Sequence, residues 1–180
     1  HINYYIDMTS LKHRAGMASS AARELSNEYT NTTMIETIVC MDGCEVIGGF
    51  LADELRRNGI QSLNEGREIN VITPEYNGTG QMIFRDNIQP MVWGKKVLLL
   101  LASATTGNRA LECIRYYNGE VVGIAALFSA IRERNGIPVN MLFTPEDLPD
   151  YSTFPADQCP QCKKNQKIDA IVNSFGYSKI

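Results

Sequence analysis

The chain has 180 residues, of which 44% are hydrophobic and 21% charged. This length suits one domain with a substantial core, and the composition excludes a disordered or fibrous protein. A net charge of −3 argues against broad attraction to nucleic acid, so no nucleic acid partner is expected. No apolar run approaches the roughly 18 residues that a membrane helix needs, so no membrane partner is expected either.

Cysteine usage and the N-terminal residues indicate a cytoplasmic protein. Five cysteines are an odd number, which does not suit a secreted disulfide framework and agrees with reduced thiols. The chain does not open with a basic segment followed by an apolar one, which is the pattern of a secretory signal. We therefore expect a cytoplasmic location.

Strand and helix patterns alternate along the chain. Residues 1–7 are aromatic and β-prone, and Gly48 and Gly49 interrupt an otherwise helical pattern, where their small size would let the helix approach a sheet. The predicted strands are 34–40, 69–73, 97–101, 120–127 and 139–143. The predicted helices are 11–29 with Thr9 or Ser10 as cap, 45–58, a segment ending near Tyr117, a helical turn at 131–135 closed by Gly136, and 168–175. Between the second and third strands lies a loop, 74–92, with a turn at 77–80 and an irregular β-arm.

This alternation predicts a parallel, doubly wound sheet with helices on its faces. Ligands of such sheets lie beyond the carboxyl ends of the strands. The turns at 41–44 and 102–109 and the loop at 74–92 all follow predicted strands, so they are expected to meet at one site.

The stretch from Lys95 to Tyr117, KKVLLLLASATTGNRALECIRYY, is the most informative part of the chain. Val97–Leu101 suits a strand that is buried on both faces. A turn of small and hydroxylated residues follows, and then apolar residues recur at helical spacing. Strand, turn and helix in this order bring unpaired backbone N–H groups and the positive end of a helix dipole to one point. The turn is therefore a candidate phosphate site.

These residues resemble the phosphoribosyl-pyrophosphate signature of the type I phosphoribosyltransferases, in which four apolar residues and two acids precede a Thr-Thr-Gly-Gly-type loop. Here Leu101 and Ala102 stand in place of the two acids. In the family the acids hold the ribose hydroxyls and the loop holds the 5′-phosphate. The resemblance implies a phosphate-binding set of Ser103, Ala104, Thr105, Thr106, Gly107, Asn108 and Arg109, of which the last two replace the second glycine and the hydroxyl residue after it.

Other segments are similar to the orotate branch of this family. The string from Tyr4 to Asp7 is similar to a Tyr-Tyr-x-Asp string that precedes the first helix and helps to form a hood over the base. The turn of Asp42, Gly43 and Cys44 falls where the family contacts the pyrophosphate. Thr73 and Pro74 stand where active orotate enzymes commonly carry Arg-Lys, and Arg85, Lys95 and Lys96 are the cations expected nearby.

The resemblance implies an α/β fold: a parallel sheet of about five strands flanked by helices, with a small hood. We expect one domain over 1–180, with a core from 31–143 and a hood from 1–30 and 144–180. The implied function is transfer of ribose 5-phosphate from phosphoribosyl pyrophosphate to a pyrimidine or purine base, with orotate first, Mg²⁺ as cofactor and a homodimer as assembly. Because the acid pair and the strand-end cations are missing, the alternative is a non-catalytic protein that binds a nucleoside monophosphate or sugar phosphate as a sensor or regulator. No catalytic residue is assigned.

The tail contains the pair Cys159 and Cys162, spaced as Cys-Pro-x-Cys. A closed structural zinc site needs four ligands, and no second pair lies nearby in the sequence. Some relatives in the orotate branch carry a C-terminal Cys-Pro-x-Cys as well. Zinc ligation, a reversible disulfide and packing as plain thiols all remain open at this point.

Overall fold

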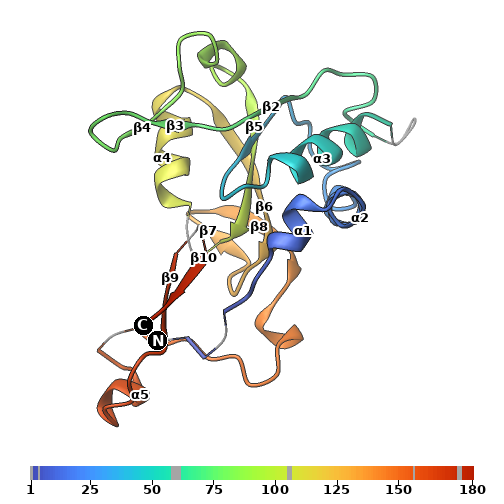
Figure 1. Cartoon of the computed structure of the whole chain (residues 1–180). Helices are drawn as coiled ribbons and strands as arrows, with labels where there is room; N and C mark the ends of the chain where they lie inside the picture. The colour runs from blue at the N-terminus through green and yellow to red at the C-terminus, as the bar shows by residue number, and fades with distance from the viewer. Residues whose placement is uncertain (1, 4, 58–61, 105–106, 156, 174–175) are drawn as a thin grey trace.

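A six-stranded sheet in the order β2-β1-β5-β6-β8-β7 forms the centre of the computed structural model, which describes residues 2–3, 5–57, 62–104, 107–155, 157–173 and 176–180 (Figure 1). Its parallel strands are β1 (Thr37–Cys40), β2 (Asn70–Ile72), β5 (Lys96–Ser103), β6 (Glu120–Phe128) and β8 (Ile137–Phe143). The edge strand β7 (Glu133–Arg134) pairs antiparallel with β8. The expected parallel sheet of about five strands is therefore confirmed.

Helices cover both faces of this sheet. The helices α2 (Ala15–Ser26) and α3 (Glu45–Arg57) pack on one face against a buried cluster that includes Leu98 and Leu100. The helix α4 (Asn108–Tyr116) packs on the other face against a cluster that includes Leu99 and Leu101. Successive side chains of β5 thus enter opposite cores, which explains why this strand is a continuous apolar run. Within the described ranges, the helices are all too short or too polar to cross a bilayer.

The predicted helix over 11–29 is two helices. The first, α1 (Thr9–His13), ends where Arg14 takes an extended conformation with φ −89° and ψ 115°, and α2 starts at Ala15. The amphipathic pattern predicted the helical residues but not the break. Leu11 of α1 still packs against the same core as α2.

Two other predicted helices are strands. At 131–136, β7 and β8 form a hairpin whose turn residues Asn135 and Gly136 have φ of 52° and 78°, as in the type I′ turn that an Asn-Gly pair favours. At 168–175 the tail instead forms β9 (Ala170–Asn173), which pairs antiparallel with β10 (Gly176–Lys179). The β-branched residues Ile171 and Val172 favour the extended form there.

The loop after β2 contains the predicted β-arm. Its strands β3 (Glu75–Tyr76) and β4 (Met82–Ile83) pair antiparallel, and the short 3-10 helix η2 (Gln89–Met91) leads back toward β5. Asn77 organises the turn between the strands, because its side-chain oxygen accepts hydrogen bonds from the N–H groups of Thr79 and Gln81 at 3.0 and 2.9 Å. The arm is a structured hairpin.

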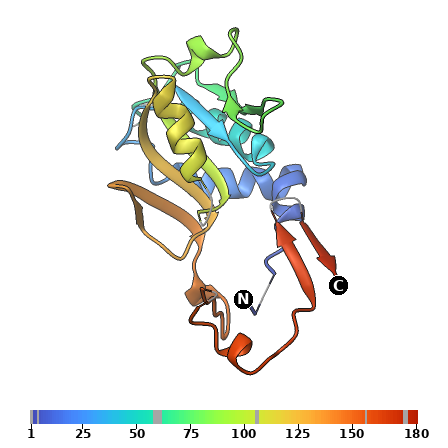
Figure 2. The same cartoon turned by 90° about the vertical axis from the view of Figure 1, so that its left-hand side faces the viewer.

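The first residues and the tail lie together below the sheet (Figures 1 and 2). Ile2 pairs with Thr153 in an isolated antiparallel bridge, and the rings of Tyr5 and Tyr177 lie 5.1 Å apart between centroids. The 3-10 helix η3 (Pro145–Asp147) and the helix α5 (Pro160–Lys163) belong to the same tail. We call the described residues within 2–7 and 150–180 the terminal module.

Candidate functional site

The topology brings the turns after β1 and β5 to one place. These two strands are neighbours in the middle of the sheet, and the strand order reverses direction between them, with β2 beyond β1 and β6 beyond β5. The backbone N–H of Met41, which begins the first turn, donates to the carbonyl of Leu100 in β5 at 2.9 Å. Such a switch point at the carboxyl edge is where doubly wound sheets bind ligands.

The turn after β5 leads directly into α4. Ala104 is buried, and its N–H donates to the carbonyl of Phe128 in β6 at 3.1 Å, which fixes the start of the turn. Gly107 closes the turn with φ +113°, and the exposed Asn108 and Arg109 begin the helix. Thr105 and Thr106 of the predicted phosphate set lie outside the described residues.

Leu101 packs against this turn from inside the protein. Its side chain is 1% exposed, and a Cβ added at Gly107 would lie only 2.9 Å from Leu101 Cδ1. Position 107 therefore requires glycine, both for its positive φ and for this close approach. The first position of the family's acid pair thus holds a core side chain, and Ala102 packs against the core of the opposite face.

Arg134 lies beside the same turn, and sequence reasoning did not find it. From β7, its Nη1 donates to Oδ1 of Asn108 at 2.7 Å, and its Nη2 donates to the carbonyl of Ala104. Its Nε is buried and has no hydrogen-bond partner among the described residues. One guanidinium group therefore connects the two ends of the turn and adds positive charge next to the N-terminus of α4.

The turn after β1 receives a cation from α1. Asp42 and Gly43 have positive φ values of 58° and 76°, and Lys12 Nζ donates to the carbonyl of Asp42 at 2.7 Å. The ring of His13 lies on the same turn, since a Cβ at Gly43 would be 3.8 Å from His13 Cε1. Lys12 and Asp42 are separated by 30 residues, so the sequence carried no signal for this contact.

Cys44 is the residue of this turn that faces the protein core. It is fully buried, and burial raises the pKa of its thiol to about 12, so the group stays protonated at neutral pH. Its backbone N–H donates to the carbonyl of Met41 at 3.1 Å. Of the three residues predicted for the pyrophosphate loop, Asp42 and Gly43 are the more accessible ones.

The other expected cations lie elsewhere or are paired. Arg85 Nη2 is 2.6 Å from Glu75 Oε2 within the β-arm, and this hydrogen-bonded partner holds the pKa of Glu75 below its ordinary value. Lys96 is the first residue of β5 and Lys95 precedes it, so both lie at the opposite end of the sheet from the turns. Lys95 pairs there with Glu36 at 3.1 Å.

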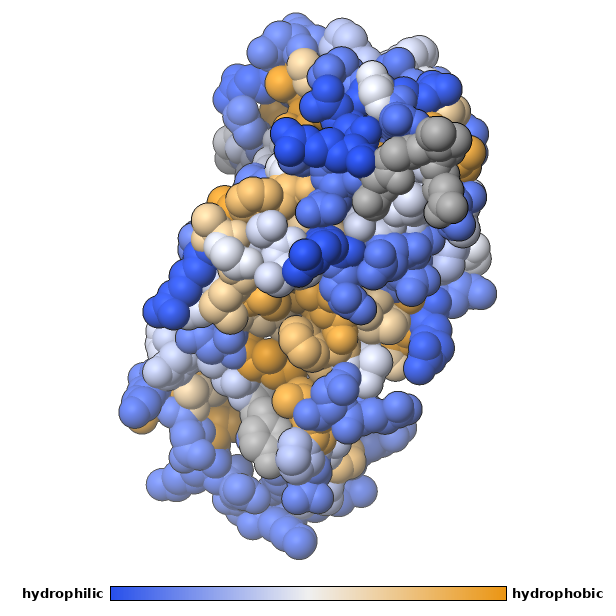
Figure 3. Space-filling model, turned by 90° about the vertical axis from the view of Figure 1, so that its right-hand side faces the viewer, coloured by the Kyte–Doolittle hydropathy of each residue, from blue (hydrophilic) through white to orange (hydrophobic). Residues whose placement is uncertain are grey.

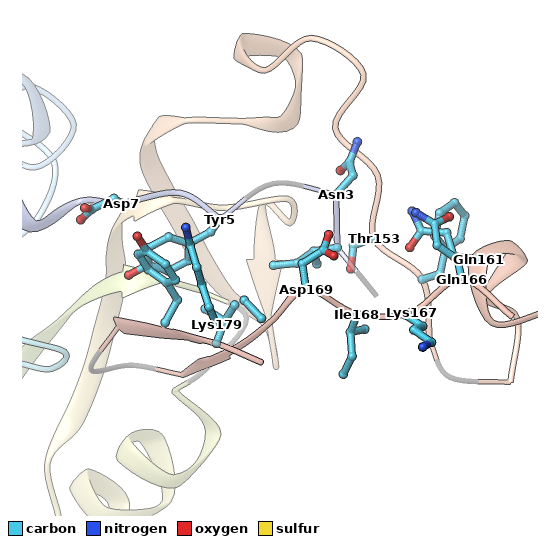
Figure 4. Close-up of a pocket in the computed structure, with 15 residues that line it drawn as sticks. Asn3, Tyr5, Asp7, Thr153, Gln161, Gln166, Lys167, Ile168, Asp169 and Lys179 are labelled. Carbon is cyan, nitrogen blue, oxygen red and sulfur yellow. The ribbon is translucent and has the colours of Figure 1, made fainter.

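A cavity of about 1040 Å³ lies in the terminal module (Figure 4). Polar and charged side chains line much of it, among them Tyr5, Asp7, Thr153, Lys167, Asp169 and Lys179. A second cavity of about 410 Å³ shares Tyr5, Asp7 and Tyr177 with it. The described residues of the two turns line neither cavity.

Cys159 and Cys162 lie at α5 in the terminal module, away from both turns (Figures 1 and 2). Among the described residues, these cysteines do not join a group of three or more Cys, His, Asp or Glu side chains that could hold a metal ion. Neither cysteine therefore takes part in the site that the sheet forms.

Comparison with known proteins gives matches in structure alone. No family model and no curated protein sequence matches the chain. The orotate phosphoribosyltransferase of Mycobacterium tuberculosis, solved with 5-phospho-α-D-ribosyl 1-diphosphate, is similar at 18% identity and a TM-score of 0.55, over 80% of this chain and 82% of that one.

Two adenine phosphoribosyltransferases are also similar. The enzyme of Leishmania donovani has 15% identity and a TM-score of 0.54, over 80% of this chain and 71% of its own. That of Trypanosoma brucei, solved with AMP, pyrophosphate and ribose-5-phosphate, has 12% identity and a TM-score of 0.53, over 88% and 81%. Together with the strand order, these similarities show that the chain has the type I phosphoribosyltransferase fold.

Proposed function

We propose that the protein binds phosphoribosyl pyrophosphate at the carboxyl edge of its sheet and transfers the ribose 5-phosphate to a nitrogenous base, with orotate as the first candidate. The observation that carries this proposal is the turn between β5 and α4. It lies at the switch point of the sheet, leads into a helix N-terminus and is held by Arg134 through Ala104 and Asn108. These are the features of a phosphate site.

The donor and the acceptor base each have a place in this proposal. The 5′-phosphate lies in the turn of residues 103–109, and the pyrophosphate faces Asp42 and Gly43, where Lys12 supplies a positive charge. The base lies toward the terminal module, where the rings of Tyr5 and Tyr177 offer an aromatic surface. A nucleoside monophosphate would occupy the same phosphate and base positions.

Mg²⁺ fits this arrangement as an ion that arrives with the pyrophosphate. The described residues contain no cluster of three or more acidic, His or Cys side chains that would hold a metal by themselves. Mg²⁺ commonly binds through substrate phosphates with only one or two carboxylates and several waters. Asp42 and Glu45, which follow β1, are the carboxylates that would contact the ion there.

A second candidate function is binding without catalysis, as a sensor or regulator. Leu101 favours it, because a buried leucine cannot take the part of the acid that holds the ribose hydroxyls in the family. The β-arm also favours binding without catalysis, because its cation Arg85 is already paired with Glu75. A site with fewer cations stabilises a departing pyrophosphate less in the transition state, which lowers the rate.

Titration calorimetry followed by an activity screen distinguishes the two candidates. We expect the transferase to bind phosphoribosyl pyrophosphate with Mg²⁺ and to form a nucleotide with orotate or another base. Binding of ribose 5-phosphate or orotidine monophosphate, without turnover of any base and without an effect of Mg²⁺, would establish the non-catalytic binder. Absence of binding for all three ligands would refute both.

The proposal includes a cytoplasmic homodimer. An apolar area crosses the middle of the face in Figure 3, which is the side of the molecule that carries α2 and α3 in Figure 1. Apolar side chains exposed on these two helices include Met17 and Val46. Areas of this kind often mark contacts between proteins. Analytical ultracentrifugation of the full chain tests the dimer, and a monomer at all concentrations would exclude it.

A further inference from the structure

Cys159 and Cys162 lie on one turn of the protein and contact each other. Cys159 precedes α5, and its Sγ accepts a hydrogen bond from the backbone N–H of Cys162 at 3.4 Å. Pro160 occupies the first position of the helix between them. The pair is therefore held in a fixed arrangement by the local backbone.

The spacing permits a disulfide after a small local movement. Residues three apart on a helical turn have Cβ atoms roughly 5–6 Å apart. A disulfide requires roughly 3.5–4.5 Å between the Cβ atoms. Adjustment of this one turn closes the gap, and the sheet and its helices do not have to move.

The two thiols differ in exposure and in acidity. Cys159 is buried and Cys162 is exposed. Desolvation acts to raise the pKa of Cys159, but hydrogen bonds from Cys162 and from the backbone of Gln161 outweigh it and lower this pKa below its ordinary value. The hydrogen bond to Cys159 raises the pKa of Cys162. A stabilised thiolate next to an accessible thiol is typical of a dithiol that undergoes exchange.

The other cysteines of the chain lack this environment. Cys40 and Cys44 are fully buried in the core, and burial raises the pKa of both thiols. Cys113 is also buried, and burial raises its pKa to about 11. Buried thiols with raised pKa values are unreactive. A third protein ligand that would make Cys159 and Cys162 a metal site is also lacking among the described residues.

We propose that Cys159 and Cys162 are a redox-active dithiol that small disulfides of the glutathione class oxidise reversibly. The thiolate of Cys159 accepts the proton of the exposed Cys162 thiol, and the Cys162 sulfur attacks one sulfur of the disulfide, which forms a mixed disulfide and releases one small thiolate; this thiolate takes the proton back from Cys159. Cys159 then attacks the sulfur of Cys162, which forms the internal S–S bond and releases the second small thiol. The two cysteines together lose two electrons and two protons, and the small disulfide gains them.

Oxidation of this pair changes the wall of the cavity in the terminal module. Gln161, which lies between the two cysteines, lines the large cavity (Figure 4), and its carbonyl accepts the N–H of Gln166 at 3.0 Å. Gln166 lines the same cavity. Closing the disulfide tightens the turn that carries Gln161 and so changes this wall.

The test is a redox titration of the full chain in mixtures of reduced and oxidised glutathione. After quenching, the protein is denatured and all reduced thiols are alkylated. Trypsin then releases the peptide 135–163, which contains Cys159 and Cys162 and no other cysteine. We expect this peptide to lose both labels and two hydrogens of mass as the oxidised form increases, and to regain both labels with a reductant. A peptide that stays fully labelled in excess oxidised glutathione would refute the proposal, as would stoichiometric zinc in the purified protein.

Serine variants of the two cysteines show which thiol makes the first attack and which makes the second. In Cys159→Ser the resolving thiol is missing, so we expect a glutathione adduct to accumulate on Cys162. In Cys162→Ser the accessible thiol is missing, so we expect Cys159 to keep its label. Cys113→Ser is the matched control and is expected to titrate like the unmodified protein. An unchanged titration in Cys162→Ser would overturn the mechanism, and the peptide from the unmodified protein gives the main result even where a variant does not fold.

Discussion

Nη1 of Arg134 donates a hydrogen bond to Oδ1 of Asn108 at 2.7 Å, which joins the edge strand β7 to the first residue of α4. The same guanidinium group donates to the carbonyl of Ala104 at the other end of the turn. The edge hairpin thereby supports the turn that the resemblance implies for phosphate binding.

Replacing Arg134 by Gln is expected to weaken binding of ribose 5-phosphate by roughly 10- to 100-fold, because a hydrogen bond to a charged group contributes about 1.5–3 kcal/mol. Titration calorimetry measures the effect. Arg132→Gln is the matched control, since Arg132 is exposed on the same segment. Equal affinities for the two variants would show that Arg134 does not act on the phosphate.

Replacing Lys12 by Met is expected to weaken phosphoribosyl pyrophosphate binding and to leave ribose 5-phosphate binding nearly unchanged. Lys12 contacts the turn at Asp42, which faces the pyrophosphate in our proposal, and only the first ligand has that group. The ratio of the two dissociation constants serves as an internal control for folding. A similar loss for both ligands would place Lys12 elsewhere in the site or show a general effect on the fold.

Gly48 and Gly49 are expected to respond to alanine in opposite ways. A Cβ at Gly48 would lie 2.3 Å from Cys40 Sγ in the core, so Gly48→Ala is expected to lower the free energy of unfolding by about 1–3 kcal/mol. At Gly49 a Cβ meets no atom within 4 Å, and the exposed helix gains up to about 1 kcal/mol from alanine. Urea unfolding of both variants measures this. The explanation by close packing fails if Gly48→Ala is as stable as Gly49→Ala.

Glu36 is expected to stabilise the fold at neutral pH and to lose this effect in acid. The backbone N–H of Lys96 donates to its carboxylate at 3.0 Å, Lys95 adds an ion pair at 3.1 Å, and these contacts hold the pKa of Glu36 below its ordinary value. A folded-state pKa below the unfolded value of about 4.3 stabilises the folded state above that pH, and the stabilisation disappears as pH falls through the folded-state pKa.

The corresponding variant is Glu36→Gln. We expect it to be less stable than the unmodified protein by about 1 kcal/mol at pH 7, because the ion pair is partly exposed, and equally stable below about pH 3. Chemical unfolding at a series of pH values tests this, with Glu24→Gln on the exposed side of α2 as control. A difference between wild type and variant that does not change with pH would exclude a charge effect.

The sequence predicted the elements whose signal is local. Val97–Leu101 is apolar throughout because β5 is covered by helices on both faces, and the helical spacing after it matches α4. The Asn-Gly pair at 135–136 also carries a local signal, and that signal is typical of a β-hairpin turn. The prediction that Gly136 ends a helix was therefore wrong. In 11–29 the helical periodicity of apolar residues continues across Arg14, although the helix itself is interrupted there.

The sequence by itself determined the parallel α/β class, the turn between β5 and α4 and the absence of acids at Leu101 and Ala102. Each of these features depends on residues that follow one another in the chain. Only the tertiary structure placed Lys12 on the turn at Asp42 and Arg134 on the turn at Ala104 and Asn108. It also showed that Leu101 packs against Gly107. Contacts between residues so far apart depend on strand order and on where α1 and β7 lie, and these are fixed by packing of the whole chain rather than by any local pattern.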